Sequence, residues 1–270
     1  MKFTTLALLA TGAELALGAR LTEKRRANHA AKFAQRANQR HSSPRIDASD
    51  VKYNETSHVS YSTNWAGSVY TSTKITGVTG TIVVPTPSAG DGSGIKSALE
   101  GYCASAWVGI DGDTCDTAIL QTGVDFCYED GDVSFDAWYE WYPDYAYDFT
   151  MDISAGDTIV MTVEATSTSK GTATIENTTT GKTVDYTWTT TEGDLCEYDA
   201  EWIVEDFEEG LSLVPFADFD TVEFTEAYAT KSTGTTVDAG EGSIIDIRQS
   251  GTVYTSCSAT GETVTCTYES

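Results

Sequence analysis

The sequence predicts an all-β fold, and three observations indicate it. From residue 59 onward, segments rich in Val, Thr and Tyr alternate between apolar and polar residues with a period of two. Gly, Ser, Asp and Pro bound these segments, as expected where short strands are joined by turns. No amphipathic helical pattern of useful length follows residue 50. Because many short strands share one body of roughly 210 residues, we expect a single antiparallel β-sandwich with a sizeable core.

The predicted strands follow one another through this body. Strand patterns without concentrated acids lie at residues 59–70, 74–85, 157–168, 171–188, 221–230 and 251–268. The stretch at residues 86–101 is rich in Gly, Ser and Ala, so we expect an exposed loop there, of the kind that proteases cut.

The first 55 residues differ in composition from the rest. Residues 1–19 combine Lys2 with a short apolar run and small residues near its end, which is typical of a secretory signal peptide. Residues 1–45 hold nine Lys or Arg and two Glu, for a net charge of 9 − 2 = +7. Residues 46–270 hold seven Lys or Arg and 39 Asp or Glu, for a net charge of 7 − 39 = −32. We therefore expect a secreted, extracellular protein in which a basic propeptide at residues 20–55 is attracted to an acidic domain at residues 56–270.

The excess of carboxylates limits both conditions and partners. Carboxylates repel one another at neutral pH and become neutral near about pH 4, so the composition indicates a protein that works in acid. The alternative is that the acids only provide solubility. The acidic domain is unsuited to nucleic acid or anionic membranes, and the apolar run of the leader is too short to span a bilayer. We expect neither partner, and we expect a monomer.

Cysteine and histidine usage narrows the chemistry. An even count of six cysteines in a secreted chain predicts disulfides, among which a hairpin bridge from Cys257 to Cys266 is the simplest, and no CxxC spacing suggests zinc. The histidines are His29, His41 and His58, all before the predicted strands. The strand-rich body therefore has no imidazole for Ser–His–Asp or Cys–His catalysis or for a metal site, which leaves carboxyls and tyrosines for acid–base work.

Four further segments place acids and aromatic rings on common strand faces, because residues of equal parity share a face. The shared faces hold Trp107, Gly109 and Asp111; Gln121, Gly123 and Asp125; Trp138, Glu140 and Tyr142; and Glu201, Ile203, Glu205 and Phe207. If these faces line one sheet, they form an aromatic-walled groove in which a water between a carboxyl and an amide could attack a carbonyl. The alternative is that each acid is a solvated surface residue and each Trp belongs to the core.

These segments resemble the fungal glutamic peptidases, also called eqolisins. The motifs are YSTNWAGSVY, ASAWVGIDGDTC, TAILQTGVDFCYEDG, DAWYEWYPDYAYDF and CEYDAEWIVEDFEEG, and the resemblance covers most of residues 59–270. It implies two large antiparallel sheets, similar to legume-lectin and jelly-roll folds. It also implies an acid-active, pepstatin-insensitive endopeptidase that cuts proteins and peptides without metal or cofactor, and a propeptide that inhibits its own domain.

The resemblance also implies particular site residues. The catalytic glutamine of the LQTG motif falls at Gln121, and the catalytic glutamate of the AEWIVE motif falls at Glu201. Glu201 would act as general base on a water, which requires a pKa raised only modestly, and Gln121 would hold the oxyanion. The implied substrate-binding residues are Trp107, Asp111, Asp125, Trp138 and Glu140.

Two other functions stay open on the residues alone. Paired carboxylates beside an aromatic groove are typical of a glycoside hydrolase, although a glutamine cannot be its general acid. Abundant Trp and Tyr would also suit a non-catalytic carbohydrate-binding lectin.

Three features of maturation and modification are also predicted. Beside the hairpin bridge we expect the disulfides Cys103–Cys127 and Cys115–Cys196. Asn54 and Asn177 head candidate glycosylation motifs. Some eqolisins are cut into two chains in a loop equivalent to residues 86–101, but this loop is short and Lys96 is its only basic residue, which disfavours such a cut.

Overall fold

The computed structural model describes residues 40–48, 59–91, 101–210 and 212–269, and these belong to one compact unit that begins at Arg40. The predicted signal peptide and most of the predicted propeptide lie outside the described residues. Within them the fold is all-β, as predicted, and its helical content is a single 3-10 turn at Ala239–Glu241. Among the same residues, no helix has the length and apolarity that crossing a membrane requires.

The first of two large sheets has nine strands, and it contains all four acidic and aromatic segments. Its strands pair antiparallel except for β2, which runs parallel to β17. Its spatial order is β18 (Thr252–Val253), β17 (Ser243–Gln249), β3 (Trp65–Thr71), β12 (Asp199–Glu205), β5 (Tyr102–Ile110), β6 (Ile119–Glu129), β7 (Asp132–Tyr142) and β8 (Tyr147–Asp148), with β2 (Val59–Ser62) beside β17.

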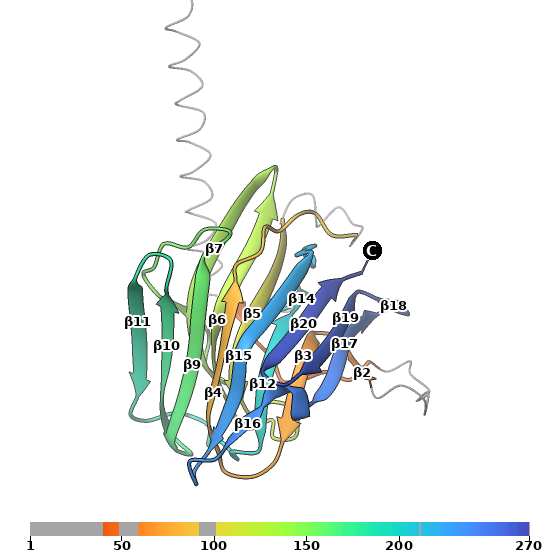
Figure 1. Ribbon diagram of the computed structural model, residues 1–270. Helices are drawn as coiled ribbons and strands as arrows, with labels where there is room; N and C mark the ends of the chain where they lie inside the picture. Colours follow the sequence, from red (N-terminus) through yellow and green to blue (C-terminus); the bar gives the residue numbers. More distant parts are fainter. Residues whose placement is uncertain (1–39, 49–58, 92–100, 211, 270) are drawn as a thin grey trace, which may run out of the picture. The chain divides into compact units, whose positions relative to one another are not determined.

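The second sheet has eight strands and is the one in front in Figure 1. Its order is β11 (Lys182–Trp188), β10 (Lys170–Asn177), β9 (Thr158–Ser167), β4 (Ile75–Val83), β15 (Thr221–Lys231), β20 (Thr263–Tyr268) and β19 (Thr255–Thr260), with β16 (Thr236–Asp238) beside β15. A small third sheet joins β1 (Arg40–His41), β13 (Glu208–Glu209) and β14 (Ser212–Leu213).

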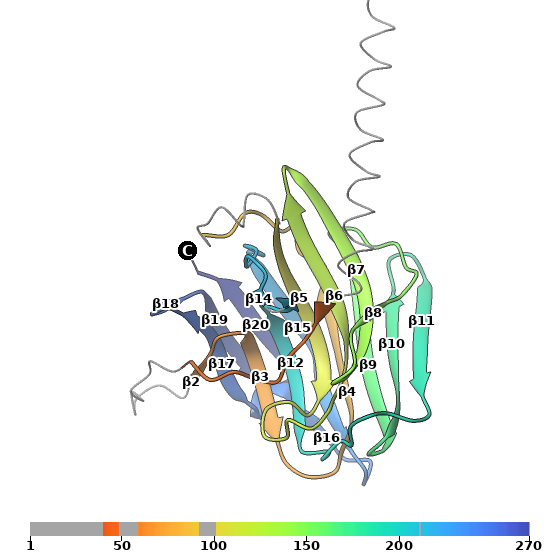
Figure 2. The same cartoon turned by 180° about the vertical axis from the view of Figure 1, so that it is seen from behind.

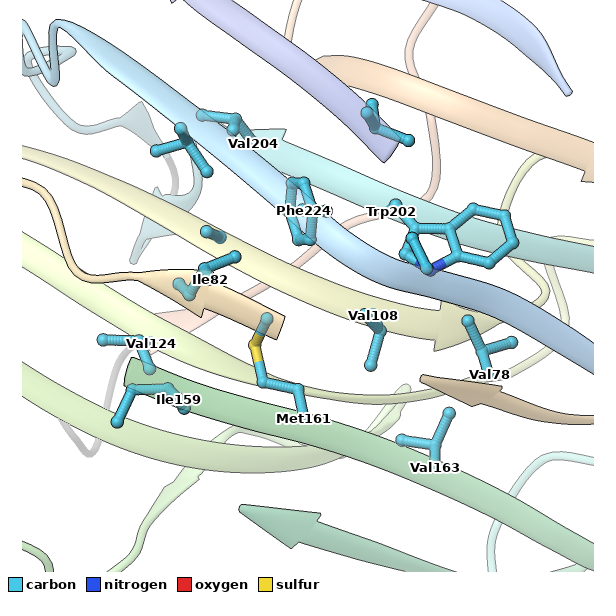
Figure 3. Close-up of a cluster of buried hydrophobic side chains, with 14 of the residues drawn as sticks. Val78, Ile82, Val108, Val124, Ile159, Met161, Val163, Trp202, Val204 and Phe224 are labelled. Atoms are coloured by element: carbon cyan, nitrogen blue, oxygen red, sulfur yellow. The ribbon is translucent and has the colours of Figure 1, made fainter. Parts of the chain in front are cut away.

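The core lies between the two large sheets. Alternate residues of β9 are buried while their neighbours face outward, which is the period of two that the sequence predicts. Figure 3 shows side chains from both sheets meeting, with Trp202 of β12 beside Val108 of β5 and Val78 of β4. The Trp202 ring nitrogen also donates a hydrogen bond to the Thr79 carbonyl, 2.7 Å away, so its one polar atom is satisfied inside the core. This hydrogen bond links β12, the strand that carries the AEWIVE motif, to β4 of the opposite sheet.

All three expected disulfides are present. Cys103–Cys127 joins β5 to β6, Cys115–Cys196 joins two loops, and Cys257–Cys266 bridges the β19–β20 hairpin. The loop expected at residues 86–101 is described only in part, since residues 92–100 lie outside the described residues.

The candidate glycosylation motif at Asn177 is buried. The Asn177 side chain is fully inaccessible; its amide donates to Asp157 at 2.9 Å and its oxygen accepts from the Thr180 N–H at 3.1 Å. Both ends of the amide are therefore used by the fold, and a glycan has no room there. The other motif, at Asn54, lies outside the described residues.

Candidate active site

Three neighbouring strands bring Gln121 and Glu201 to one face of the nine-stranded sheet. Gly109 of β5 lies opposite Glu201 of β12 on one side and opposite Gln121 of β6 on the other. Directly opposed residues share a face, and neighbouring strands are about 4.8 Å apart, so the two Cα atoms are roughly 10 Å apart. This face is turned away from the second sheet, and we call it the site face. Both long side chains can reach the space above Gly109.

Gly109 is required by its surroundings. A Cβ atom at this position would lie 2.8 Å from the Trp107 ring and 3.3 Å from the Cβ of Gln121. Gly123 is hemmed in similarly, since a Cβ there would lie 2.5 Å from that of Trp107. The two glycines thus leave room for the Trp107 ring and keep the gap between Glu201 and Gln121 open.

The polar atoms of this pair are buried and unpaired. Gln121 and Glu201 are both fully inaccessible, and none of their four side-chain nitrogen and oxygen atoms has a hydrogen-bond partner among the described residues. Leaving a buried polar group unpaired costs about 1–3 kcal/mol, so proteins rarely do it without a functional reason. The pair is the strongest candidate for the chemical centre.

The charge state of Glu201 differs from the expectation. Burial, followed by the nearby carboxylates of Asp199, Asp111 and Asp113, raises the pKa of Glu201 well above its usual value. The expectation of a modest rise is therefore wrong for this form of the chain, because no cation or donor offsets the lost hydration. With segment 40–48 in place, burial and these carboxylates favour the protonated form of Glu201, which cannot accept a proton from water.

Asp111 lies just beyond the end of β5. Its φ is 69°, in the left-handed region, and its carboxylate accepts hydrogen bonds from the backbone N–H groups of residues 196, 197, 198 and 199, at 2.7–3.2 Å. Both oxygens are used by the loop that leads into β12. The structure thus gives Asp111 a positioning role, and its predicted contact with substrate stays a prediction.

Asp125, Trp138 and Glu140 come together around a residue that the sequence did not single out, Arg40. The Arg40 guanidinium donates to both oxygens of Asp125, at 2.7 and 3.0 Å, and to Glu140 at 3.3 Å. It also lies over the Trp138 ring, 3.7 Å from the centroid, and donates to Ser105 at 3.3 Å. We call these four partners the Arg40 pocket. It is a buried, bidentate cation site of the kind that arginine fits best.

Arg40 belongs to a peptide segment that crosses the site face. Figure 2 shows this segment, residues 40–48, in red-orange across the nine-stranded sheet. The Ser42 N–H donates to Glu140 at 3.1 Å, and the Trp65 ring nitrogen donates to the Ser43 carbonyl at 3.1 Å. Further along the segment, Arg45 forms an ion pair with Asp113 at 2.8 Å. The segment lies in the predicted propeptide, so the site face binds an extended peptide of this same chain.

Two buried carboxyls beside Arg40 also have shifted acidity. Burial raises the pKa of Glu140 to about 8 and that of Glu205 to about 7, and the charge of Arg40 lowers both only in part. Glu205 accepts a hydrogen bond from the Trp107 ring nitrogen at 2.9 Å. Both groups are therefore largely protonated in acid.

Arg40, Ser105 and Glu205 were missed as site residues. Alternation did place Glu205 on the face of Glu201, but no site role was assigned to it. Arg40 lies 85 residues from Asp125 in sequence, and its only signal was the general positive charge of the amino-terminal arm.

Comparisons with known proteins agree with this geometry. A model of the Peptidase A4 family matches residues 63–268. Aspergillopepsin-2 of Aspergillus niger is 56% identical over 285 residues, which cover 99% of this chain and 100% of that protein. A crystal structure of scytalido-glutamic peptidase with a transition state analog inhibitor is 42% identical, has a TM-score of 0.69, and is matched over 77% of this chain and 98% of its own. That of aspergilloglutamic peptidase from Aspergillus niger is 65% identical, with a TM-score of 0.61, over 62% of this chain and 99% of its own.

The resemblance to eqolisins is thus confirmed, and so is the β-sandwich that it implied. The glycoside hydrolase and lectin alternatives for the groove have no support in these comparisons. The chain belongs to the Peptidase A4 family and is a glutamic peptidase.

Proposed function

We propose that this chain is the precursor of a secreted, acid-active endopeptidase that uses Glu201 and Gln121 and resists pepstatin. The observation that carries the proposal is that both side chains flank Gly109 on one face with all their polar atoms unpaired among the described residues. Secretion is supported by three disulfides and no free cysteine in the described part of the chain, since disulfides form in oxidising compartments. The monomeric state stays a prediction.

In the proposed reaction Glu201, once solvated and ionised, takes a proton from a water whose oxygen attacks the peptide carbonyl carbon. The Gln121 amide donates a hydrogen bond to the oxyanion of the tetrahedral intermediate. Glu201 then gives its proton to the leaving nitrogen as the C–N bond breaks, which yields a carboxylic acid and an amine. A carboxamide suits this role because it stays neutral at every pH, whereas a second carboxyl would share the proton.

We further propose that segment 40–48 inhibits the peptidase before maturation. Arg40 occupies the pocket built by Asp125, Trp138 and Glu140, the same residues expected to hold substrate. Once the segment is gone, water reaches Glu201, and a solvated carboxyl ionises at a lower pH than a buried one.

The test is acid proteolysis of an unfolded protein in the presence of pepstatin, with Glu201→Gln and Gln121→Ala compared with wild type. Loss of one oxyanion donor typically lowers the rate by about a hundredfold to a thousandfold, and loss of the base lowers it at least as much. Glu176→Gln, an exposed glutamate on β10, is the matched control and keeps wild-type activity. Retained activity in both site variants would refute the dyad.

A further inference from the structure

A hollow lies on the large sheet opposite the site face. It occupies about 340 Å³ on the outer face of the eight-stranded sheet, the face in front in Figure 1, and no part of the peptidase mechanism uses it. Its volume is at the lower end of the range for small-molecule sites, about 300–1,000 Å³. Strands β4, β9, β10 and β15 supply its lining, which includes Gly77, Thr79, Glu164, Thr172, Tyr228 and Thr230.

Gly77 forms part of the floor of the hollow and brings no side chain into it. It lies near the start of β4, opposite Glu164 of β9 on one side and Thr230 of β15 on the other. A Cβ there would meet only ordinary contacts, 3.5 Å from the Thr230 Cβ and 3.6 Å from the Val163 carbonyl oxygen. Packing therefore does not require glycine here, although glycine weakens a strand and often marks a place where a ligand approaches.

A β-bulge shapes the adjoining wall. Between the pairs Thr225–Thr81 and Tyr228–Thr79, β15 contains one residue more than β4, and Glu226 adopts a φ of 50°. The bulge accompanies a change of neighbour along β15 from β20 to β16. One consequence is that Tyr228 faces outward beside the hollow, and re-aiming a side chain is a common effect of bulges at binding sites.

The groups around the hollow are hydroxyls, one phenol and one carboxylate. Among the described residues, no hydrogen bond or ion pair engages the Glu164 carboxylate or the Tyr228 hydroxyl. The Thr79 hydroxyl is fixed by the Met161 carbonyl, at 3.0 Å, and by Thr162, at 2.9 Å, so this wall is ordered in advance. We propose that the hollow around Gly77 binds a neutral oligosaccharide, with Tyr228 stacking on a sugar ring and Glu164 accepting hydrogen bonds from its hydroxyls.

Other ligand classes fit less well. The lining contains no Lys or Arg, and the carboxylate and the acidic body disfavour anions such as phosphates. An apolar ligand would cover the hydroxyls of six threonines and the Glu164 carboxylate without replacing their hydrogen bonds to water. An organic cation would find one carboxylate and one ring, rather than the cage of several aromatic rings that such ligands favour.

The test is a calorimetric titration of the full chain with linear hexasaccharides of glucose, mannose and N-acetylglucosamine. We expect one of them to bind with a one-to-one stoichiometry and a Kd below about 1 mM. Gly77→Val places a branched side chain on the floor of the hollow while keeping a good strand residue, and we expect it to abolish binding. Glu164→Gln weakens binding by about tenfold through loss of a charged acceptor.

Controls separate this site from the peptidase. Glu176→Gln removes an exposed carboxylate from the same sheet face outside the hollow and leaves binding unchanged. All three variants retain peptidase activity, which reports that they are folded. The proposal is overturned if no hexasaccharide binds below about 1 mM, if Gly77→Val binds as well as wild type, or if n-butylamine binds more tightly than every saccharide.

Discussion

The outer faces of the two large sheets follow the same alternation but differ in what they bury. On the site face Glu140, Glu201 and Glu205 are completely inaccessible, whereas Glu164 and Glu176 on the other outer face are exposed to water. An exposed carboxylate costs little, but a buried one must be protonated or paired. Strand pattern alone therefore does not distinguish a functional acid from a solubilising one, whereas burial does.

The cost of burying the acids of the site face is offset in two ways, whereas the exposed acids of the other face stay hydrated. One is the Arg40 pocket, where a single guanidinium compensates Asp125 and Glu140. The other is protonation, which the raised pKa values of Glu140 and Glu205 favour. The ion pairs of Arg40 and the protonation of the buried glutamates can be removed by separate substitutions. In each case a substitution of an exposed residue on the other sheet is the control.

The largest expected effect is a loss of stability with rising pH. Glu140 and Glu205 have ordinary values near 4.5 and folded pKa values of about 8 and about 7, so the folded state binds more protons than the unfolded state between these limits. Stability is then fully present below about pH 4.5 and is lost as pH rises toward 8. We expect the melting temperature to fall by roughly 10 °C, measured in the Gln121→Ala background so that the segment stays attached.

Glu205→Gln keeps an acceptor for the Trp107 ring nitrogen but cannot titrate, so the melting temperature falls less steeply with rising pH. Glu176→Gln on the exposed face leaves the pH dependence of the melting temperature unchanged. A melting temperature that does not vary from pH 4 to pH 8 would contradict the assignment of raised pKa values.

Removal of Arg40 is expected to act next most strongly. Arg40→Met leaves Asp125 and Glu140 buried without their cation, and breaking a buried pair costs about 3 kcal/mol or more. Lys182→Met on the exposed strand β11 changes stability by less than about 1 kcal/mol. Denaturant unfolding at neutral pH measures both, and equal effects of the two substitutions would show that the Arg40 pocket is not special.

Two glycines on opposite faces offer a smaller, sharper contrast. Gly109→Ala forces a methyl group against the Trp107 ring, which costs about 1–3 kcal/mol and narrows the gap between Glu201 and Gln121. Gly77→Ala meets only ordinary contacts and is expected to stabilise by less than about 1 kcal/mol. In thermal melts the melting temperature of Gly109→Ala should fall and that of Gly77→Ala should rise slightly. In peptidase assays Gly109→Ala should lose activity and Gly77→Ala should stay near wild type; loss of activity in both variants would remove the distinction.

The smallest effect concerns the acidity of the mature centre. The carboxylate of Asp113 contributes to the raised pKa of Glu201, so Asp113→Asn lowers that pKa. In the proposed mechanism activity requires ionised Glu201, so we expect the acid limb of the kcat/KM profile to move to lower pH, by less than about one unit. Asp185→Asn on exposed β11 is the matched control. A limb that moves to higher pH would exclude this electrostatic coupling.

Much of the fold and the centre was predictable because both depend on local pattern. Alternation assigned Gln121, Glu201 and Trp107 to common faces, and the register of β12, β5 and β6 agrees. Alternation does not extend to Asp111, because parity holds only along regular extended backbone and Asp111 has a positive φ. Its predicted contact with substrate stays a prediction. The acidity of Glu201 was missed, since the number of charges around a carboxyl is a property of three dimensions.

The Arg40 pocket was beyond sequence reasoning for a related reason. Long-range attraction between a basic arm and an acidic domain depends on total charge and not on individual residues, so it does not indicate which arginine enters which site. Arg40 is chosen because β1 pairs with β13, which directs the guanidinium toward Trp138 and Asp125.

The row Glu201–Gly109–Gln121 also sets an order of events during synthesis. The ribosome makes Arg40 long before Glu201, at a separation of 201 − 40 = 161 residues. Strand β12 lies between β3 and β5, so Glu201 and Gln121 can come together only after this late strand has been inserted between two early ones. By then segment 40–48 has already been translated, so the proposed inhibitor is present before the proposed centre forms.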